Sequence, residues 1–377
     1  MRTAHILVVD DEPGIVRAVE RVLGGAHQVS GTSSSHAALS LAEQIRPELA
    51  ILDIRMPDVD GFELMSRLKA RFPDLDVILM TGSIDDLDEK LVRALRSPAF
   101  YFIQKPFDRE VLRTLVERCL DLRWRREDHQ RNLERLETEM AEARAFQQSL
   151  LPEREAVLND LSICCRYTPC ARLGGDLYDY VDAGHRRTAL LIADVSGHGV
   201  SAAMLTGVVK SAFRASSAEG YDPLAVVQRV WNGLSAFGPD RFVTLFAGLV
   251  STSERQLRYV NAGHPSVLLW NATRKREWLE STGPLISPVL SASTWDVGTV
   301  AMDEGDQLLL YTDGVSEVIA DTNDCVQLRI QALTGEQAPA DAQVLEAILA
   351  AVHNDLAGAP QPDDLTLLTA RRLNTAL

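Results

Sequence analysis

Residues 49–61 read LAILDIRMPDVDG. Four apolar residues lead into Asp53, and the chain then passes through a proline and two further aspartates to Gly61. A short apolar run bounded by turn residues is typical of a strand that is buried on both faces, as in a parallel sheet between helices. The stretch therefore predicts a buried strand whose carboxyl end carries a carboxylate.

Three other short apolar runs also stop beside a side chain that can take part in chemistry. Residues 6–9 precede Asp10 and Asp11, residues 77–80 precede Thr81, and residues 102–103 precede Lys105. The carboxyl ends of parallel strands open onto one crevice, where ligands bind. We therefore expect four consecutive strands to bring these groups together with Asp53.

Helical patterns alternate with the apolar runs, at Pro13–Leu23, Ser35–Ile45, Gly61–Arg71, Asp86–Arg96 and from Asp108 onward. This alternation predicts an α/β domain with a five-stranded doubly wound parallel sheet. Its crevice would hold three carboxylates, and one like-charged pair about 4 Å apart costs on the order of 4 kcal/mol at an effective dielectric near 20. A divalent cation would offset that repulsion, and Lys105 could pair with an incoming anion.

This arrangement resembles the receiver domain of bacterial two-component response regulators, whereas the alternative is an ordinary flavodoxin-like domain with acids at its strand ends. The resemblance implies that a cognate histidine kinase transfers a phosphoryl group to Asp53. It also implies a Mg²⁺ site formed by Asp10, Asp11, Asp53 and the backbone carbonyl of Arg55. Lys105 would bind the phosphoryl oxygens, while Thr81 and Phe102 would form the switch.

A long helical segment follows, because no proline or glycine occurs from Arg113 to Leu150 before Pro152 gives a stop signal. Residues recur every seven positions at Leu115, Leu122, His129, Leu136, Ala143 and Leu150. This heptad pattern, with its polar breaks, predicts a coiled coil that forms a homodimer. A single amphipathic helix packed on its own domain is the alternative. The arginine-rich patch at 123–126 is interpreted as a solvated face.

After residue 161 the strands and helices become grouped. Strands are expected at Ile163–Thr168, Leu177–Val181, Thr188–Ala193, Phe242–Val250, Leu257–Asn261, Val267–Trp270, Gln307–Tyr311 and Leu365–Ala370. Helices are expected at Val200–Ser217, Pro223–Phe237 and Asp341–His353. Such grouping predicts an α+β fold, a β-sandwich flanked by helices. We expect a first domain at 1–122, a helical linker at 123–151 and a second domain at 152–377.

Aspartates stand at four of these strand ends, beside glycines or turn residues: Asp176, Asp194, Asp313 and Asp363. Carboxylates without histidine or cysteine partners suit Mg²⁺ or Mn²⁺, and the ligand type does not separate the two ions. Two such ions can lower the pKa of a shared water, which then attacks phosphorus. The pattern therefore indicates a second metal site with hydrolytic chemistry.

Together with residues 146–152 (FQQSLLP), 197–204 (GHGVSAAM) and 261–265 (NAGHP), these motifs resemble the PPM, or 2C-type, metal-dependent protein phosphatases, specifically their bacterial SpoIIE-like branch. By this resemblance, Asp194 would bridge two metals, with the Val195 carbonyl on one of them, and Asp176 would bind directly or through water. Asp313 and Asp363 would complete the other site.

Four further residues near these motifs have more than one interpretation. Asp364 is the alternative to Asp363 as a ligand, and Asp179 is expected to be an outer-shell acid. His198 and His264 are candidates for protonating a leaving serine alkoxide, or else loop histidines that hydrogen-bond a neighbour. The sequence assigns neither histidine a role.

Composition limits the partners and the compartment. The net charge of -15 and the pI near 5.0 argue against a nucleic-acid partner. The five cysteines show no zinc-type spacing and suit a reducing environment. Because no apolar run approaches the roughly 20 residues that a bilayer span needs, we expect a cytoplasmic protein without a membrane partner.

These patterns predict a response regulator whose output is a serine/threonine phosphatase. The resemblance suggests a phosphoserine on an anti-sigma-factor antagonist of the STAS type as substrate, and hence partner switching of gene expression. One alternative is a catalytically inactive adaptor that binds a sigma factor or its regulator. Another is a dimeric scaffold with a vestigial phosphatase. Whether phosphorylation of Asp53 activates or inhibits stays open.

Overall fold

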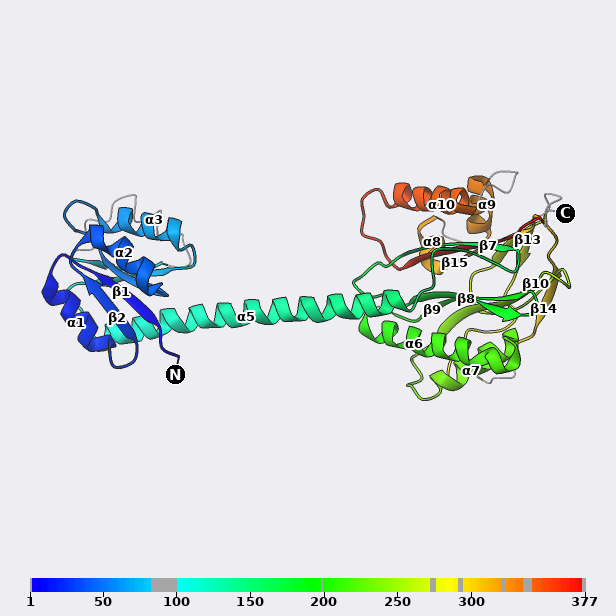
Figure 1. Ribbon diagram of the computed structural model, residues 1–377, viewed down its shortest axis with the longest axis horizontal. Helices are drawn as coiled ribbons and strands as arrows, with labels where there is room; N and C mark the ends of the chain where they lie inside the picture. The colour runs from blue at the N-terminus through cyan, green and yellow to red at the C-terminus, as the bar shows by residue number, and fades with distance from the viewer. Residues whose placement is uncertain are drawn as a thin grey trace. The chain divides into compact units, whose positions relative to one another are not determined.

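The computed structural model describes residues 2–82, 100–197, 199–271, 276–290, 294–319, 323–334 and 341–374. The chain divides into two compact units, Met1–Leu136 and Glu137–Leu377. Figure 1 labels their helices and strands.

The first unit is a parallel sheet with strand order β2-β1-β3-β4-β5. The strands are β1 (His5–Val9), β2 (Gln28–Thr32), β3 (Leu49–Asp53), β4 (Asp76–Thr81) and β5 (Phe100–Gln104). The helices are α1 (Pro13–Leu23), α2 (Ser35–Ile45), α3 (Gly61–Arg71) and α5 (Arg109–Ser149). The predicted doubly wound fold is confirmed, but the four expected strands are not consecutive, because β2 lies between β1 and β3 in the chain. The helix expected at 86–96 lies outside the described residues.

The helix boundaries in this unit follow from local capping chemistry. Ser34 and Asp60 each accept a hydrogen bond from the backbone of the residue three positions later, which closes the first turns of α2 and α3. Pro13 opens α1, where its missing N–H costs nothing. These signals are readable in the sequence, and the predicted bounds of all three helices match the structure.

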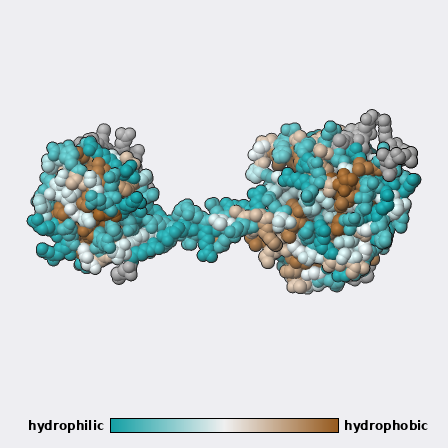
Figure 2. All heavy atoms as spheres, in the orientation of Figure 1, coloured by the Kyte–Doolittle hydropathy of each residue, from teal (hydrophilic) through white to brown (hydrophobic). Residues whose placement is uncertain are grey.

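Helix α5 is packed on its own unit only over its first turns. Leu112, Val116, Cys119 and Leu120 are buried against the sheet. Further along, Leu133 and Leu136 are exposed, and Figure 2 shows a mainly hydrophilic surface over the middle of the helix. The interpretation as a helix packed wholly on its own domain therefore fails beyond about residue 128, whose carboxylate still pairs with Arg2.

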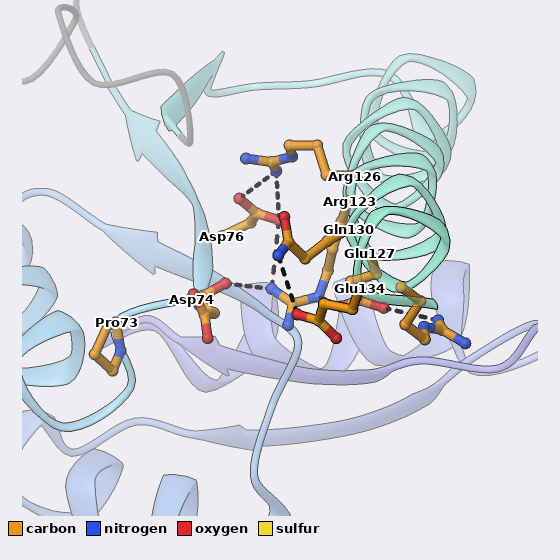
Figure 3. A pocket seen from close by; sticks show the side chains of 9 residues that line it. Pro73, Asp74, Asp76, Arg123, Arg126, Glu127, Gln130 and Glu134 are labelled. Atoms are coloured by element: carbon orange, nitrogen blue, oxygen red, sulfur yellow. Dashed lines mark hydrogen bonds and ion pairs between the residues drawn. The ribbon is translucent and has the colours of Figure 1, made fainter. Parts of the chain in front are cut away.

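The patch at 123–126 is not simply a solvated face (Figure 3). Asp76 is 1% exposed at the start of β4, and Arg126 binds both of its carboxylate oxygens, at 3.0 and 3.2 Å. Arg123 lies 3.6 Å from the same carboxylate, and Trp124 donates to Glu48 at 3.0 Å. These contacts fasten α5 to the sheet end opposite Asp53, since a buried carboxylate needs a cationic partner.

The second unit is a sandwich of two antiparallel sheets. One has the order β14-β11-β10-β9-β8, with β8 (Asp176–Gly184), β9 (Arg187–Val195), β10 (Val243–Ser251), β11 (Gln256–Ala262) and β14 (Gly298–Ala301). The other has the order β13-β12-β15-β16-β7-β6, with β6 (Glu155–Leu158), β7 (Leu161–Thr168), β12 (Val267–Trp270), β13 (Arg276–Leu279), β15 (Gln307–Tyr311) and β16 (Leu365–Arg372).

Helices cover the outer faces of this sandwich, as Figure 1 shows. They are α6 (Val200–Ala215) and α7 (Pro223–Leu234) on the first sheet, and α8 (Asp313–Ile319), α9 (Asn323–Thr334) and α10 (Asp341–Leu356) on the second. Side chains such as Ile192, Phe246 and Leu308 fill the core between the sheets. The predicted α+β sandwich is confirmed. Helices α8 and α9 and the short strands β6, β13 and β14 were not predicted. The seven residues of α8 and the four of each strand are too few to show a period, and the 12 residues of α9 have only a weak amphipathic pattern.

Candidate active site

The receiver crevice gathers the expected acids and the lysine. Carboxylate oxygens of Asp10, Asp11 and Asp53 all lie within 4.8 Å of one another. The Lys105 ammonium lies 2.6 Å from Asp10 and 2.7 Å from Asp53. Burial raises the pKa of Asp53, and the hydrogen bond from Lys105 opposes that shift. Such a compact set of hard oxygen donors fits Mg²⁺.

The other receiver residues stand around this cluster. The backbone N–H of Arg55 donates to Asp53 at 3.1 Å, so the peptide after the aspartate is close enough for its carbonyl to join a metal site. Thr81 ends β4, and its carbonyl accepts the Lys105 N–H at 2.7 Å. Phe102 is half-buried on β5, next to Leu79 in the register of the sheet. Their switch roles remain predictions.

The second acidic cluster lies at one end of the sandwich, where both sheets contribute. Asp176 opens β8 and faces Asp194 of β9 in register. Asp313 is the first residue of α8, directly after β15, and Asp363 stands just before β16. Four segments that are far apart in the sequence therefore bring one carboxylate each to the same end of the fold.

Hydroxyl groups from the second sheet fix Asp176. Its Oδ2 accepts hydrogen bonds from Thr312 at 2.8 Å and from Thr366 at 2.6 Å, and the residue is 3% exposed. These bonds tie β8 to the ends of β15 and β16. They set the spacing between the two sheets at the point where the acids converge.

The acids of this cluster make one another harder to ionise. Burial, followed by the charges of Asp313 and Asp363, raises the pKa of Asp194 to about 8. Burial, Asp363 and Glu317 raise the pKa of Asp313 to about 6. The neighbours that shift the pKa of Asp194 most are all carboxylates. Crowded carboxylates of this kind fit divalent cations, which would lower these pKa values.

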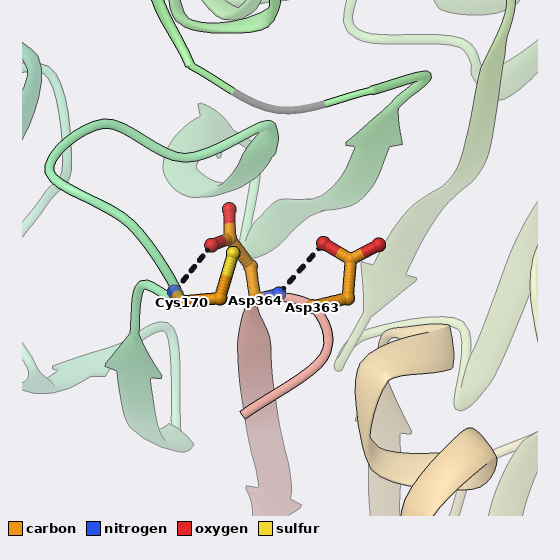
Figure 4. Close-up of side chains that lie close together, drawn as sticks. All are labelled: Cys170, Asp363 and Asp364. Carbon is orange, nitrogen blue, oxygen red and sulfur yellow. Dashed lines mark hydrogen bonds between the residues drawn. The ribbon is translucent and has the colours of Figure 1, made fainter. Parts of the chain in front are cut away.

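The two adjacent aspartates have different partners (Figure 4). Asp364 is 2% exposed and accepts the backbone N–H groups of Cys170 at 2.8 Å and Gly175 at 2.7 Å. Asp363 is half-buried. Among the described residues, its side chain accepts a hydrogen bond only from the backbone N–H of Asp364, at 2.7 Å. Asp364 is thus committed to holding the loop before Asp176. The geometry favours Asp363 as the metal ligand.

A pair of variants separates these two roles. Asp363→Asn is expected to lose most metal-dependent activity while its metal-free unfolding temperature stays at or above that of the parent. Asp364→Asn weakens the bonds that hold the 170–175 loop, and we expect it to lose about 1–3 kcal/mol of stability. Phosphate release and thermal unfolding without metal measure both effects. The opposite pattern would exchange the two assignments.

Asp179 does not belong to the metal site. Leu177 and Val181 on the same face of β8 pack against the helix layer, whereas Asp176 points between the sheets. Asp179 is fully buried, with Lys210 at 2.9 Å and Arg214 at 2.6 and 2.8 Å, both on α6. Strand alternation explains this, because residues three positions apart face opposite sides. The expected outer-shell acid is instead an anchor for α6.

His264 is a buried, neutral side chain. It is 4% exposed, and its ring Nδ1 lies 3.0 Å from the Thr244 hydroxyl. Its backbone N–H donates to the Asn261 side-chain oxygen at 2.9 Å. Burial lowers its pKa to about 3. Thr244 of β10 stands opposite Asp194 of β9 in the sheet. His264 therefore contacts the strand that pairs with the Asp194 strand. This environment suits the hydrogen-bonding loop histidine rather than a proton donor. His198 lies outside the described residues.

His264→Gln is therefore expected to change stability and leave the acid limb of the pH–rate profile in place. Below about pH 6.5, His264 of the unfolded parent binds a proton, whereas His264 of the folded protein stays neutral down to about pH 3. This residue therefore makes the stability of the parent fall as the pH falls. The variant lacks that contribution. Unfolding temperatures between pH 4 and 7, with rates over the same range, test this. A displaced acid limb would show that His264 titrates during turnover.

Two residues of this site were not predicted from the sequence. Glu317 stands one helical turn after Asp313 and contributes to raising the pKa of Asp194 and Asp313. An acid four residues after the aspartate was visible, but its proximity depended on the missed helix α8. Gln147, in the last turn of α5, is 8% exposed, donates to the Gly174 carbonyl at 2.6 Å and accepts its N–H at 3.2 Å. It clamps the loop before Asp176.

The fold and the acid clusters define a receiver domain joined to a PPM-type phosphatase domain. The sequence model of the response regulator receiver domain matches residues 6–117. The model of the stage II sporulation protein E (SpoIIE) family matches residues 184–373, half of the chain. The chain belongs to this SpoIIE family.

Individual relatives agree with this assignment. Protein IcfG of Synechocystis is 28% identical over 62% of the chain, and phosphoserine phosphatase RsbP of Bacillus subtilis is 30% identical over 48%. The chain spans 41% and 46% of their lengths. The crystal structure of the RsbU and RsbW domains of Rv1364c from Mycobacterium tuberculosis is 25% identical, with a TM-score of 0.51, over 59% of this chain and 63% of that one. Among the described helices, none combines the length and apolarity that a membrane span requires.

Proposed function

We propose that this protein is a metal-dependent serine/threonine protein phosphatase controlled by phosphorylation of Asp53. The convergence of Asp176, Asp194, Asp313 and Asp363 from both sheets on one crowded end of the sandwich carries the proposal. Membership of the SpoIIE family and the similarity to RsbP support it. The proposed receiver domain spans 1–122, the helical linker 123–151 and the phosphatase domain 152–377.

The chain's own residues would divide the work as follows. Two Mg²⁺ or Mn²⁺ ions would be held by Asp194 with the Val195 carbonyl and by Asp313 with Asp363. Asp176, whose position is fixed by the hydroxyls of Thr312 and Thr366, would bind directly or through water. When bound, such ions supply Lewis-acid chemistry at phosphorus and an activated water. Asp364 and Gln147 hold the 170–175 loop in place, so that Asp176 keeps its position during turnover.

A phosphoserine on a STAS-type anti-sigma-factor antagonist is the proposed substrate, because RsbP is named a phosphoserine phosphatase and Rv1364c carries an RsbU domain. We expect Mn²⁺-dependent phosphate release from such a phosphoprotein and its loss in Asp313→Asn. Unchanged release in that variant would refute the metal assignment. An inactive parent chain that still binds a sigma factor or its regulator would favour the adaptor.

The proposed regulation runs through helix α5 and a homodimer. A cognate histidine kinase would phosphorylate Asp53, and α5 joins the receiver sheet at one end to the Gln147 clamp at the other. Leu133 and Leu136 are 42% and 55% exposed and would be covered by a second copy.

Leu136→Glu tests the dimer. A carboxylate at an apolar coiled-coil position is expected to weaken association by roughly 10-fold or more, because the charge must be buried without a partner. Sedimentation equilibrium of the full chain measures this. Asn132→Glu, at an exposed position outside the heptad pattern, makes the same charge change and is the control. An unchanged association constant in Leu136→Glu would show that this face is not the dimer contact.

A further inference from the structure

The loop that enters β10 is fastened to the loop that leaves β9. The backbone N–H of Ser196 donates to the Phe242 carbonyl at 2.9 Å, and the Phe242 N–H donates to the Ser196 hydroxyl at 3.1 Å. Ser196 lies two residues after Asp194. These two bonds fix the backbone of Arg241, immediately before Phe242, beside the acidic end of the sandwich.

The Arg241 side chain reaches the rim of the acidic cluster. Its Nη1 lies 4.0 Å from the position that a Cβ atom on Gly197 would occupy. Gly197 is also close to Gly175, because a Cβ atom added to Gly175 would lie 3.0 Å from the Gly197 carbonyl oxygen. Gly175 immediately precedes Asp176. Arg241 and the two glycines therefore line one edge of the site, and the glycines leave room for a ligand's approach.

Arg241 also has a free charge. It is half-buried, and its side chain makes no hydrogen bond or ion pair with any residue that the structure describes. Other half-buried arginines of this unit are engaged, such as Arg166 with Glu346 at 2.8 Å. The Arg241 guanidinium lies beside the carboxylates that are proposed to bind metal ions, and it forms no ion pair with them. It is therefore available to bind an anion.

We propose that Arg241 binds the phosphoryl oxygens of the substrate phosphoserine, an inference that rests on the proposed phosphatase function. A phosphomonoester dianion has oxygens to spare beyond those that metal ions would contact. The planar fork of arginine matches two of these oxygens, and charge-assisted bonds of this kind are the strong ones. Because a phosphomonoester carries two negative charges, Arg241 should attract it more strongly than a carboxylate or a sulfate-ester monoanion.

Kinetics of the full chain with Mn²⁺ test this inference. Arg241→Ala is expected to raise KM for p-nitrophenyl phosphate and the inhibition constant of inorganic phosphate by about 10- to 100-fold, the usual range for a charge-assisted hydrogen bond. The Mn²⁺ concentration for half-maximal activation should not change, because Arg241 is no metal ligand. Arg241→Lys keeps the charge without the fork and should recover part of the affinity.

Arg258→Ala is the matched control. Arg258 lies on β11 of the same unit, is 40% exposed and pairs with Asp222 at 2.8 Å, so its loss should leave both constants unchanged. Unaltered KM and phosphate inhibition in a folded Arg241→Ala variant would overturn the inference. If that variant fails to fold, as judged by circular dichroism, the Arg241→Lys constants decide in the same way.

A second measurement separates this inference from the proposed function. Calorimetric titration of the Mn²⁺-loaded full chain with inorganic phosphate needs no turnover. If Arg241→Ala binds phosphate more weakly than the parent, but the parent releases no phosphate from any phosphoprotein, the phosphate site is supported and the phosphatase function is refuted. If both bind phosphate equally and the parent is active, only the phosphate site is refuted. If both bind phosphate equally and the parent is inactive, both proposals are refuted.

Discussion

Asp194→Asn is expected to abolish metal-dependent phosphate release and to raise the thermal stability of the metal-free protein. The activity should fall by at least about 1,000-fold, because bound metal ions contribute several kcal/mol to transition-state stabilisation. The stability should rise because burial, followed by the charges of Asp313 and Asp363, raises the pKa of Asp194 to about 8. At neutral pH this acid is ionised in the unfolded chain and resists ionisation in the folded one, a cost to folding that asparagine does not carry. Each kcal/mol gained shifts the unfolding temperature of a domain this size by about 2–4 °C.

The two readouts together identify the site, since a merely structural residue would lose both activity and stability. Asp182→Asn is the matched control, because Asp182 is an exposed acid on β8 that accepts a hydrogen bond from Asn159 at 3.0 Å. It should keep the activity of the parent. Added Mn²⁺ should stabilise the parent and the control and should stabilise Asp194→Asn far less. Full metal-dependent activity in Asp194→Asn would contradict the proposed two-metal site.

Beryllofluoride, a phosphoryl mimic, is expected to change the phosphatase rate of the parent chain by about 5- to 150-fold, the usual range of allosteric coupling. The mimic would meet the Lys105 ammonium, which now pairs with Asp10 and Asp53 at 2.6 and 2.7 Å. Recruiting that lysine to an added anion must rearrange the crevice. Rates with and without beryllofluoride at saturating Mg²⁺ measure both the sign and the size of the effect.

Two variants locate where the signal passes. Asp53→Asn should not respond to beryllofluoride at all, because the mimic needs the carboxylate. Gln147→Ala should still bind it, but its rate should respond less, because the clamp between α5 and Gly174 is gone. An equal response in Asp53→Asn would place the mimic elsewhere. An unchanged response in Gln147→Ala would exclude the clamp as the route.

The receiver half could be predicted well because its signals are local. Apolar runs, helix caps and the residues at strand ends are read directly from neighbouring positions, and the helices at Pro13–Leu23, Ser35–Ile45 and Gly61–Arg71 have the predicted bounds. The sandwich was predicted less completely. Its short edge strands and α8 were not predicted. A run of four residues, or a short helix that begins on a functional aspartate, has too few positions to show a hydrophobic period.

The sequence by itself determined which acids stand at strand ends, and therefore that two clusters of carboxylates would form. Only the tertiary structure decided which partner each polar group meets. Asp364 rather than Asp363 holds the loop at Cys170 and Gly175, Asp179 turns to α6, and Asp76 pairs with the arginines of α5. The physical reason is that a charge is satisfied by its neighbours in space, and in this fold those neighbours lie tens to hundreds of positions away along the chain.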